Sequence, residues 1–228
     1  MTLCINPNCS KPRNLDHHSY CENCGSKLLL KGSYRALKKL AEGGFGVTYI
    51  VRDNSKNIDK VLKILTLDKP DALRLFKQDA EILTQLNHVG IPKVEDDGYF
   101  EFFARDSKEP IHCLIMEKIE GDNLETWLEK SGKLSDQQKA LRWLIELTDI
   151  LNSVHKKGFV HRDVNLSNII LKPDGKLALI DFGTAKKYTK TYIIKAKLGE
   201  SKTVIIKKEG YRPTEQENGF PVQTEDLH

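Results

Sequence analysis

Two stretches of the sequence decide the fold: HRDVNLSN (His161–Asn168) and, after twelve intervening residues, DFG (Asp181–Gly183). In the first stretch, Asn168 follows Asp163 by five residues. An Asp after an Arg is often only a turn or a cap, because its carboxylate can bond nearby backbone N–H groups. The two stretches together, in this order and spacing, are a highly specific combination whose chance occurrence is negligible.

Two further features lie upstream. The glycine-rich turn AEGGFG (residues 41–46) could close its bare backbone over phosphates, although such a turn more often only joins a hairpin. Lys63 lies in an apolar strand and needs an anionic partner if it is buried, because an unpaired buried ammonium costs several kcal/mol. The alternative is that Lys63 extends to solvent. Asp79, on the inner side of the helix predicted after it, offers a carboxylate.

The periodicity of the apolar residues predicts a strand-rich half followed by a helix-rich half. Strands are predicted at residues 34–40, 48–52, 60–65, 99–103 and 111–116. A helix is predicted from the spacing of Leu73, Phe76, Ala80, Leu83 and Leu86. A second helix should begin at the capping box Ser135–Gln138 and end at Gly158. Its predicted apolar face consists of Leu141, Leu144, Ile145, Thr148, Leu151 and Val154.

In this order, the features resemble the motifs of the eukaryotic-type protein kinases from Tyr34 onward. The N-terminal cysteines joined to a GGFGVTY-type loop are similar to bacterial serine/threonine kinases with a short N-terminal Cys motif. The resemblance implies an α+β, protein-kinase-like bilobal fold, with an antiparallel β N-lobe carrying one helix and a helical C-lobe, preceded by a zinc-ribbon-like module. The implied divisions are the module at 1–32, the N-lobe at 33–116, the hinge at 117–121 and a partial C-lobe at 122–228.

The resemblance implies an ATP-dependent serine/threonine protein kinase that uses Mg²⁺ or Mn²⁺ and acts on a protein substrate. Lys63 would bind the α- and β-phosphates, and Asp163 would accept the proton of the substrate hydroxyl. Asp181 and Asn168 would each hold a Mg²⁺ ion. The other residues implied to surround the nucleotide are Gly43, Gly46, Thr48, Val61, Met116, Glu117, Ile119 and Ile170.

The chain departs from the kinase pattern at several positions. Asp79 stands where these kinases keep Glu, so its reach is shorter by about 1.5 Å. Asn165 replaces the Lys that contacts the γ-phosphate, and Lys208 replaces a Thr near the end of the activation segment. We hypothesise that Lys208 supplies the missing ammonium. Residues 224–228 resemble the start of the large C-lobe helix, so a truncated C-lobe and a partly uncovered second helix are expected.

Four of the five cysteines form the pattern C-x4-C-x11-C-x2-C, with Cys4, Cys9, Cys21 and Cys24. Two close pairs separated by a loop suit tetrahedral thiolate coordination of a structural Zn²⁺ ion. A segment of ~30 residues needs such a staple to hold together. Two disulfides or plain thiols are the alternatives, and disulfides conflict with a reducing cytosol. Cys113 is expected in the core.

The composition, with 39% hydrophobic and 30% charged residues, is that of a globular protein. No apolar run approaches the ~20 residues of a membrane helix, and the first residues lack the pattern of a signal peptide. We therefore expect a cytoplasmic protein without membrane contact. The net charge of +4 is too mild to predict nucleic-acid binding. The nine basic and two acidic residues between Thr184 and Arg212 form either a flexible basic loop or a phosphate-responsive one.

Three functions from different classes remain open. The first is the kinase. The second is a pseudokinase or truncated product that binds nucleotide or a partner without phosphotransfer, which Asp79, Asn165 and Lys208 favour. In the third, the cysteine module itself is the working part and binds protein or nucleic acid. Its few basic residues, Lys11, Arg13, Lys27 and Lys31, argue against nucleic acid.

Overall fold

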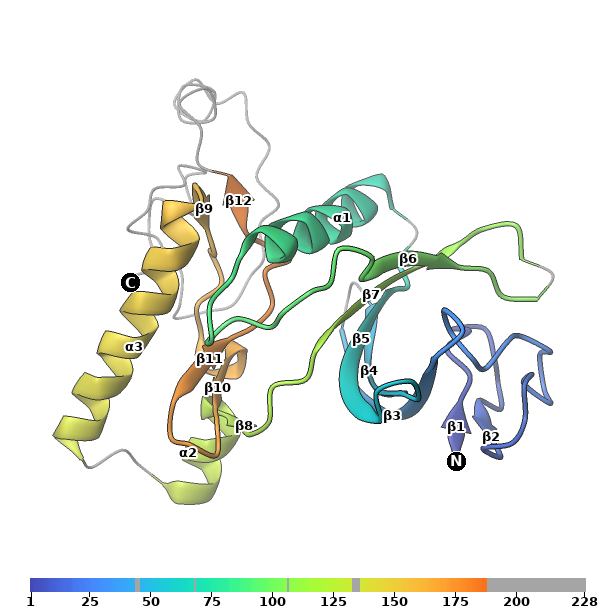
Figure 1. Ribbon diagram of the computed structural model, residues 1–228, viewed down its shortest axis with the longest axis horizontal. Helices are drawn as coiled ribbons and strands as arrows, with labels where there is room; N and C mark the ends of the chain where they lie inside the picture. The colour runs from blue at the N-terminus through green and yellow to red at the C-terminus, as the bar shows by residue number, and fades with distance from the viewer. Residues whose placement is uncertain (44–45, 68, 106, 133–135, 188–228) are drawn as a thin grey trace. The chain divides into compact units, whose positions relative to one another are not determined.

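The computed structural model of the chain describes residues 1–43, 46–67, 69–105, 107–132 and 136–187 (Figure 1). The chain separates into two compact units. The first consists of Met1–Ala80 and Lys93–Lys118, and the second of Glu81–Pro92 and the described residues from Ile119 onward. The first unit is strand-rich and the second contains the long helix, as predicted.

A seven-stranded antiparallel sheet with the order β2-β1-β3-β4-β5-β7-β6 forms the first unit (Figure 1). Its strands are β1 (Thr2–Leu3), β2 (Arg13–Asn14), β3 (Tyr34–Glu42), β4 (Gly46–Asp53), β5 (Ile58–Leu65), β6 (Tyr99–Phe102) and β7 (Ile111–Glu117). Helix α1 (Pro70–Gln85) follows β5, and its residues from Glu81 on belong to the second unit. The five strands predicted in this region and the helix are confirmed.

Alternation of side chains along β4, β5 and β7 gives this sheet two different faces. Thr48 lies opposite Lys63 and Val61 lies opposite Met116, so these four predicted nucleotide-binding residues share one face. The other face is apolar and belongs to the core. It carries Val47, Tyr49, Val51, Leu62, Ile64, Cys113 and Ile115.

Residues 1–32 cover part of this apolar face. Ile5 and Leu30, which are only 1% and 2% exposed, belong to the same core cluster as the apolar face. Strand β1 also extends the sheet, because Leu3 pairs with Ala36 of β3. The predicted boundary at residue 32 stays a prediction, and in the structure both sides of it belong to one compact unit.

The second unit contains two helices and short strands. They are β8 (Asp122–Asn123), α2 (Leu124–Ser131), α3 (Gln137–Lys156), β9 (Phe159–Val160), η1 (Leu166–Asn168), β10 (Ile169–Leu171), β11 (Leu177–Leu179) and β12 (Lys186–Lys187). The strands form a three-stranded sheet, β11-β10-β8, and a two-stranded pair, β12-β9. The pair joins the residues before HRD to those after DFG.

Helix α3 begins differently from the prediction. Ser135 lies outside the described residues, and the N-cap is Asp136, whose carboxylate accepts hydrogen bonds from the N–H groups of Gln138 and Lys139. Asp is as good an N-cap as Ser, so the helix can use either residue. Gly158 ends the helix at φ +79°, as predicted.

The predicted apolar face of α3 is right only for its C-terminal half, where Leu151 and Val154 are buried. Trp143 is buried in the N-terminal half because its ring packs edge-to-face on Trp127 of α2 at 5.3 Å. The residues predicted there, Leu141, Leu144 and Ile145, are 54%, 58% and 67% exposed, which agrees with the expectation that this helix is partly uncovered.

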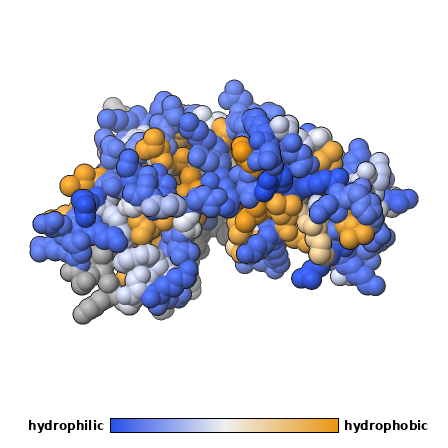
Figure 2. All heavy atoms as spheres, turned by 60° about the horizontal axis from the view of Figure 1, so that its bottom comes forward, coloured by the Kyte–Doolittle hydropathy of each residue, from blue (hydrophilic) through white to orange (hydrophobic). Residues whose placement is uncertain are grey.

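Hydrophilic side chains cover most of the face seen in Figure 2. Among the helices of the described ranges, none combines the length and apolar character needed to cross a bilayer.

The shared core predicts that residues 1–32 stabilise the strands of the first unit. Ile5→Ala should lower the free energy of unfolding by about 2–5 kcal/mol, because it removes a buried side chain and leaves a cavity. Leu15→Ala in the same segment is the control, since Leu15 is 53% exposed. Hydrogen exchange read by mass spectrometry should accelerate in β3 and β4. Unchanged exchange there would contradict the shared core.

Candidate active site and metal centre

In the first unit, β5 and α1 bring an ammonium and a carboxylate together. Lys63 Nζ lies 3.2 Å from Asp79 Oδ2, and the Asp79 side chain is 3% exposed. The predicted ion pair is therefore present, even though Asp is one methylene shorter than Glu. Breaking such a pair would leave a buried charge without its partner, so Asp79 fixes the position of the Lys63 ammonium.

The two predicted glycines of the turn differ in their surroundings. A Cβ at Gly46 would lie 1.9 Å from the Ile64 carbonyl oxygen, so the pairing of β4 with β5 itself requires glycine. A Cβ at Gly43 would meet no described atom within 4 Å, and the Gly43 N–H donates to the Gly46 carbonyl at 2.9 Å. Packing accounts for Gly46, whereas Gly43 keeps the predicted role of letting a ligand approach the backbone.

The residues predicted around the base lie partly in each unit. Met116 is buried in β7, and the N–H of Glu117 donates to the Lys93 carbonyl at 2.8 Å. Ile119 belongs to the second unit. There, Ile170 lies in β10, opposite Ala178 of β11.

In the second unit, the loop before β10 holds the Asp163 carboxylate from both sides. Asn168 Nδ2 donates to Asp163 Oδ2 at 2.8 Å and to its carbonyl oxygen at 2.9 Å. Asn165 Nδ2 donates to Asp163 Oδ1 at 2.9 Å. Because Asn168 uses its NH₂ group on Asp163, its Oδ1 is the side-chain atom suited to a cation.

The DFG residues are tied to the same loop. The Ile180 N–H, just before Asp181, donates to the Asn168 carbonyl at 2.8 Å. Phe182 is fully buried and packs edge-to-face on His161 at 4.6 Å. Asp181 has φ +66°, a left-handed conformation that costs about 1–3 kcal/mol in a non-glycine residue and is typical of functional sites. Lys208 lies outside the described residues, so its approach to Asp163 stays a prediction.

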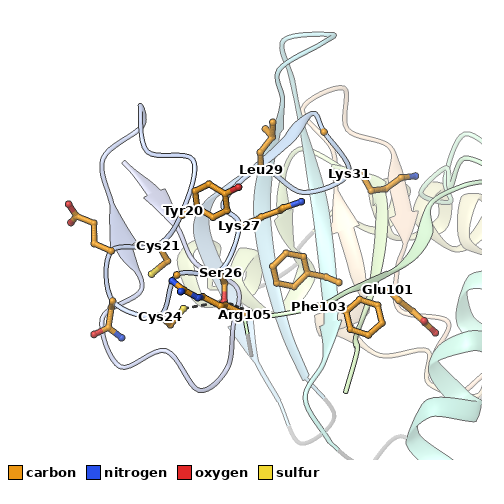
Figure 3. Close-up of a pocket in the computed structure, with 15 residues that line it drawn as sticks. Tyr20, Cys21, Cys24, Ser26, Lys27, Leu29, Lys31, Glu101, Phe103 and Arg105 are labelled. Atoms are coloured by element: carbon orange, nitrogen blue, oxygen red, sulfur yellow. Dashed lines mark hydrogen bonds between the residues drawn. The ribbon is translucent and has the colours of Figure 1, made fainter. Parts of the chain in front are cut away.

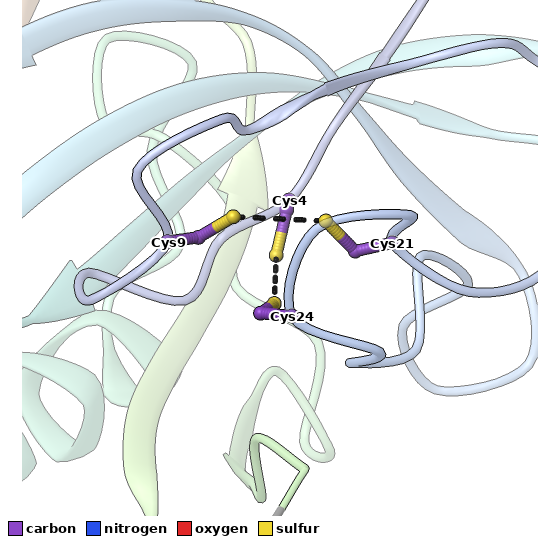
Figure 4. A group of neighbouring side chains, drawn as sticks. All are labelled: Cys4, Cys9, Cys21 and Cys24. Carbon is purple, nitrogen blue, oxygen red and sulfur yellow. Dashed lines mark hydrogen bonds between the residues drawn. The ribbon is translucent and has the colours of Figure 1, made fainter.

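The four N-terminal cysteines converge, as Figure 4 shows. The sulfurs of Cys4 and Cys24 are 3.5 Å apart, those of Cys9 and Cys21 are 3.6 Å apart, and all four lie within 4.8 Å of one another. All five cysteines are free thiols, which does not fit the disulfide alternative. Tetrahedral Zn–S bonds of about 2.3 Å place sulfurs about 3.8 Å apart, so the cluster fits one ion.

Polar side chains that the sequence reasoning missed surround these sulfurs. Asn23 Nδ2 lies 3.5 Å from Cys9 Sγ, and the buried Asn14 Nδ2 lies 3.6 Å from Cys21 Sγ. The Cys24 thiol donates to the Ser26 hydroxyl at 3.3 Å, and this hydroxyl can turn its hydrogen toward a thiolate. Asn23 and Ser26 flank Cys24 in the sequence, and this proximity was the signal from which their contacts with the sulfurs could have been predicted.

These contacts act on the thiols in opposite directions. Burial raises the pKa of Cys4 above its usual range. Burial also raises the pKa of Cys24, but hydrogen bonds from Ser26 and Asn6 outweigh it and lower that pKa to about 6. The site therefore favours one thiolate at neutral pH even before a cation adds its attraction.

Arg105, which follows β6, lies against the second cysteine pair beside a cavity of about 1100 Å³ (Figure 3). Its backbone N–H donates to Ser26 Oγ at 3.1 Å. Gly25 has φ +69°, a backbone conformation that strains other residues, so glycine is favoured there, and a Cβ at this position would lie 2.5 Å from Cδ of the flexible Arg105 side chain. A segment 79 residues away in sequence thus contacts the cysteine turn.

Comparison with known proteins agrees with the motifs. A family model described as "Protein kinase domain" matches residues 34–215. Serine/threonine-protein kinase B of Synechocystis sp. is 30% identical over 240 residues, which cover 100% of this chain and 40% of the relative. Serine/threonine-protein kinase F of the same organism is 31% identical, with 96% and 48% covered. Serine/threonine-protein kinase PknA of Mycobacterium tuberculosis is 34% identical, with 69% and 36% covered. The chain spans less than half the length of these relatives.

The contrast between the two glycines of the turn can be tested by alanine substitution. Gly46→Ala should lower the melting temperature by several degrees, because the new Cβ collides with the Ile64 carbonyl and the strands must separate. Gly43→Ala should leave the melting temperature unchanged. Thermal unfolding followed by circular dichroism measures both, and equal melting temperatures for the two variants would contradict the packing explanation of Gly46.

Proposed function

Since the chain belongs to the protein kinase family, we propose that it transfers the γ-phosphoryl group of Mg-ATP to serine or threonine hydroxyls of a protein substrate. The observation that carries this proposal is the Asp163 carboxylate, held by Asn168 in a loop beside DFG. The ion pair of Lys63 with Asp79 supports it from the first unit.

The proposed roles in the first unit concern ATP. Lys63, fixed by Asp79, binds the α- and β-phosphates, and Gly43 lets the turn approach them. Gly46, Thr48, Val61 and Met116 complete the surroundings of the nucleotide, and the backbones of Glu117 and Ile119 bond the base. Because Thr48, Val61 and Met116 share a sheet face with Lys63, these roles are mutually consistent.

The proposed roles in the second unit concern the transfer itself. Asp163 accepts the proton of the substrate hydroxyl. The oxygen of that hydroxyl forms a bond to the γ-phosphorus of ATP, while the bond between the γ-phosphorus and the leaving ADP oxygen breaks. Asn168, through Oδ1, and Asp181 hold Mg²⁺, and Mn²⁺ could replace it. When bound, these ions offset the charge of the phosphates. Ile170 packs beneath the base.

Phosphotransfer to a basic protein with radiolabelled ATP and Mg²⁺ tests the proposal. Wild type should label the substrate, and Asp163→Ala should lower the rate by about 10²–10⁴-fold, because the proton acceptor is lost. If Asp163→Ala labels the substrate as fast as wild type does, Asp163 is not the proton acceptor. Thermal stabilisation by ATP without labelling would instead favour the pseudokinase, the second candidate, which the uncharged Asn165 beside Asp163 supports.

The pairing of Lys63 predicts a specific effect at Asp79. Asp79→Asn, which keeps the shape but removes the charge, should lower kcat/KM for ATP about 100-fold, because the Lys63 ammonium is no longer held in place. Glu81→Gln on the exposed side of α1 is the matched control and should retain wild-type kinetics. Equal kinetics for the two variants would remove Asp79 from the site.

We further propose that Cys4, Cys9, Cys21 and Cys24 bind one structural Zn²⁺ ion. The separations of the four sulfurs and the donors at Cys9, Cys21 and Cys24 support it. Such an ion, when bound, holds the surrounding segment together. We also propose a cytoplasmic location, where unpaired thiols are kept reduced.

Metal analysis of the purified chain should find about one zinc per chain. Cys4→Ser should lose it, whereas Cys113→Ala should keep it, because Cys113 lies in the core of the sheet, outside the cluster. Chelation should lower the melting temperature of wild type and leave that of Cys4→Ser unchanged. Less than about half an equivalent of zinc in wild type would contradict the site.

A further inference from the structure

The Asn165 side chain is buried in the second unit, with only 3% of the residue exposed. Its Nδ2 donates to Asp163 Oδ1 at 2.9 Å and to the Asp163 carbonyl at 3.1 Å. Its Oδ1 accepts from the N–H of Ser167 at 3.0 Å and from the Ser167 hydroxyl at 2.6 Å. An Asn side chain has two N–H groups and two acceptor lone pairs. These four bonds therefore engage both of its N–H groups and its carbonyl oxygen.

Asn165 and Asn168 hold opposite oxygens of the same carboxylate. Asn165 donates to Oδ1 of Asp163, and Asn168 donates to Oδ2 at 2.8 Å. Rotation of an Asp carboxylate about its last torsion is soft and has no sharp staggered minima. Two donors on opposite oxygens fix its plane. Removal of either donor frees the carboxylate to turn away from its working orientation.

We propose that Asn165 is a positioning residue that orients the Asp163 carboxylate toward the substrate hydroxyl, and that it does not bind phosphate. The inference rests on the proposed kinase function. Asn165 stands where similar kinases have a Lys that contacts the γ-phosphate. A phosphate ligand would need donors directed at the nucleotide, whereas both N–H groups of Asn165 are directed at Asp163.

The contact can be tested without any activity, by ¹⁵N NMR of the side-chain amides of the 228-residue chain. The Asn165 amide protons should exchange slowly with water, and their signal should shift in Asp163→Ala. Asp136→Ala, which removes two hydrogen bonds at the start of α3 in the same unit, should leave that signal in place. An Asn165 signal that is identical in wild type and Asp163→Ala overturns the proposal.

The role is tested by steady-state kinetics. Asn165→Ala should lower kcat about 10–100-fold and leave KM for ATP within about twofold, because orientation of the proton acceptor is lost and ATP binding is not. Asn165→Lys should also lower kcat. A higher kcat in Asn165→Lys, or a loss confined to KM for ATP, would identify the position as a phosphate ligand and overturn the proposal.

A double-mutant cycle separates positioning from a general structural effect. In the Asp163→Ala background, Asn165→Ala should cause no further loss of kcat, whereas a merely structural defect would lower the residual rate again. Asp136→Ala controls for lost stability and should retain wild-type kcat. If the wild-type chain transfers no phosphate, the proposed function fails and the catalytic half of this inference fails with it. The NMR shift then still decides whether Asn165 holds Asp163.

Discussion

A β-strand sends neighbouring side chains to opposite faces, and this constraint organises the first unit. Lys63 reaches Asp79 from one face of β5, so Leu62 and Ile64 lie on the other. Water cannot cover that apolar face without loss of stability. Ile5, from the cysteine segment, joins its core instead. The alternation of side chains along β5 therefore places the Lys63 ion pair on one face of the sheet. It also places apolar residues on the other face, which other apolar residues must cover.

This link gives the cysteine segment a structural meaning. A segment of ~30 residues cannot order itself on its own core, so a metal bound by its four thiolates would supply the missing stability. The ordered segment then presents Ile5 and Leu30 to the sheet. The bond from the Arg105 N–H to Ser26 ties the cysteine turn to the chain that follows β6. These contacts favour a structural role of residues 1–32 within the first unit over that of a separate partner-binding module.

The sequence predicted what depends on short-range pattern. Strand period, glycine turns and motif spacing are local, and they located β3, β4, β5 and the Asp163 loop correctly. It could not predict what depends on contacts between distant segments. The contact of Trp127 with Trp143 buries a residue of α3 outside its predicted apolar face, and no period within α3 encodes this partner from α2. The hydrogen bond from the Arg105 N–H to Ser26 in the cysteine turn could not be predicted for the same reason.

The loop that contains Asp163 carries no positive charge at position 165, where similar kinases have a lysine. Asn165 and Asn168 hold Asp163 with neutral amides, so they orient the carboxylate without adding a positive charge beside it. The transferred phosphoryl group spreads negative charge over three oxygens, and fixed positive charge must stabilise it. Under the proposed function, the positive charge that this lysine would supply has to come from Lys63, from the cations that Asn168 and Asp181 would hold, and from Lys208 if it takes the predicted place. If Lys208 does not supply that charge, the proposed phosphotransfer should depend more on its metal ions than in kinases that keep the lysine.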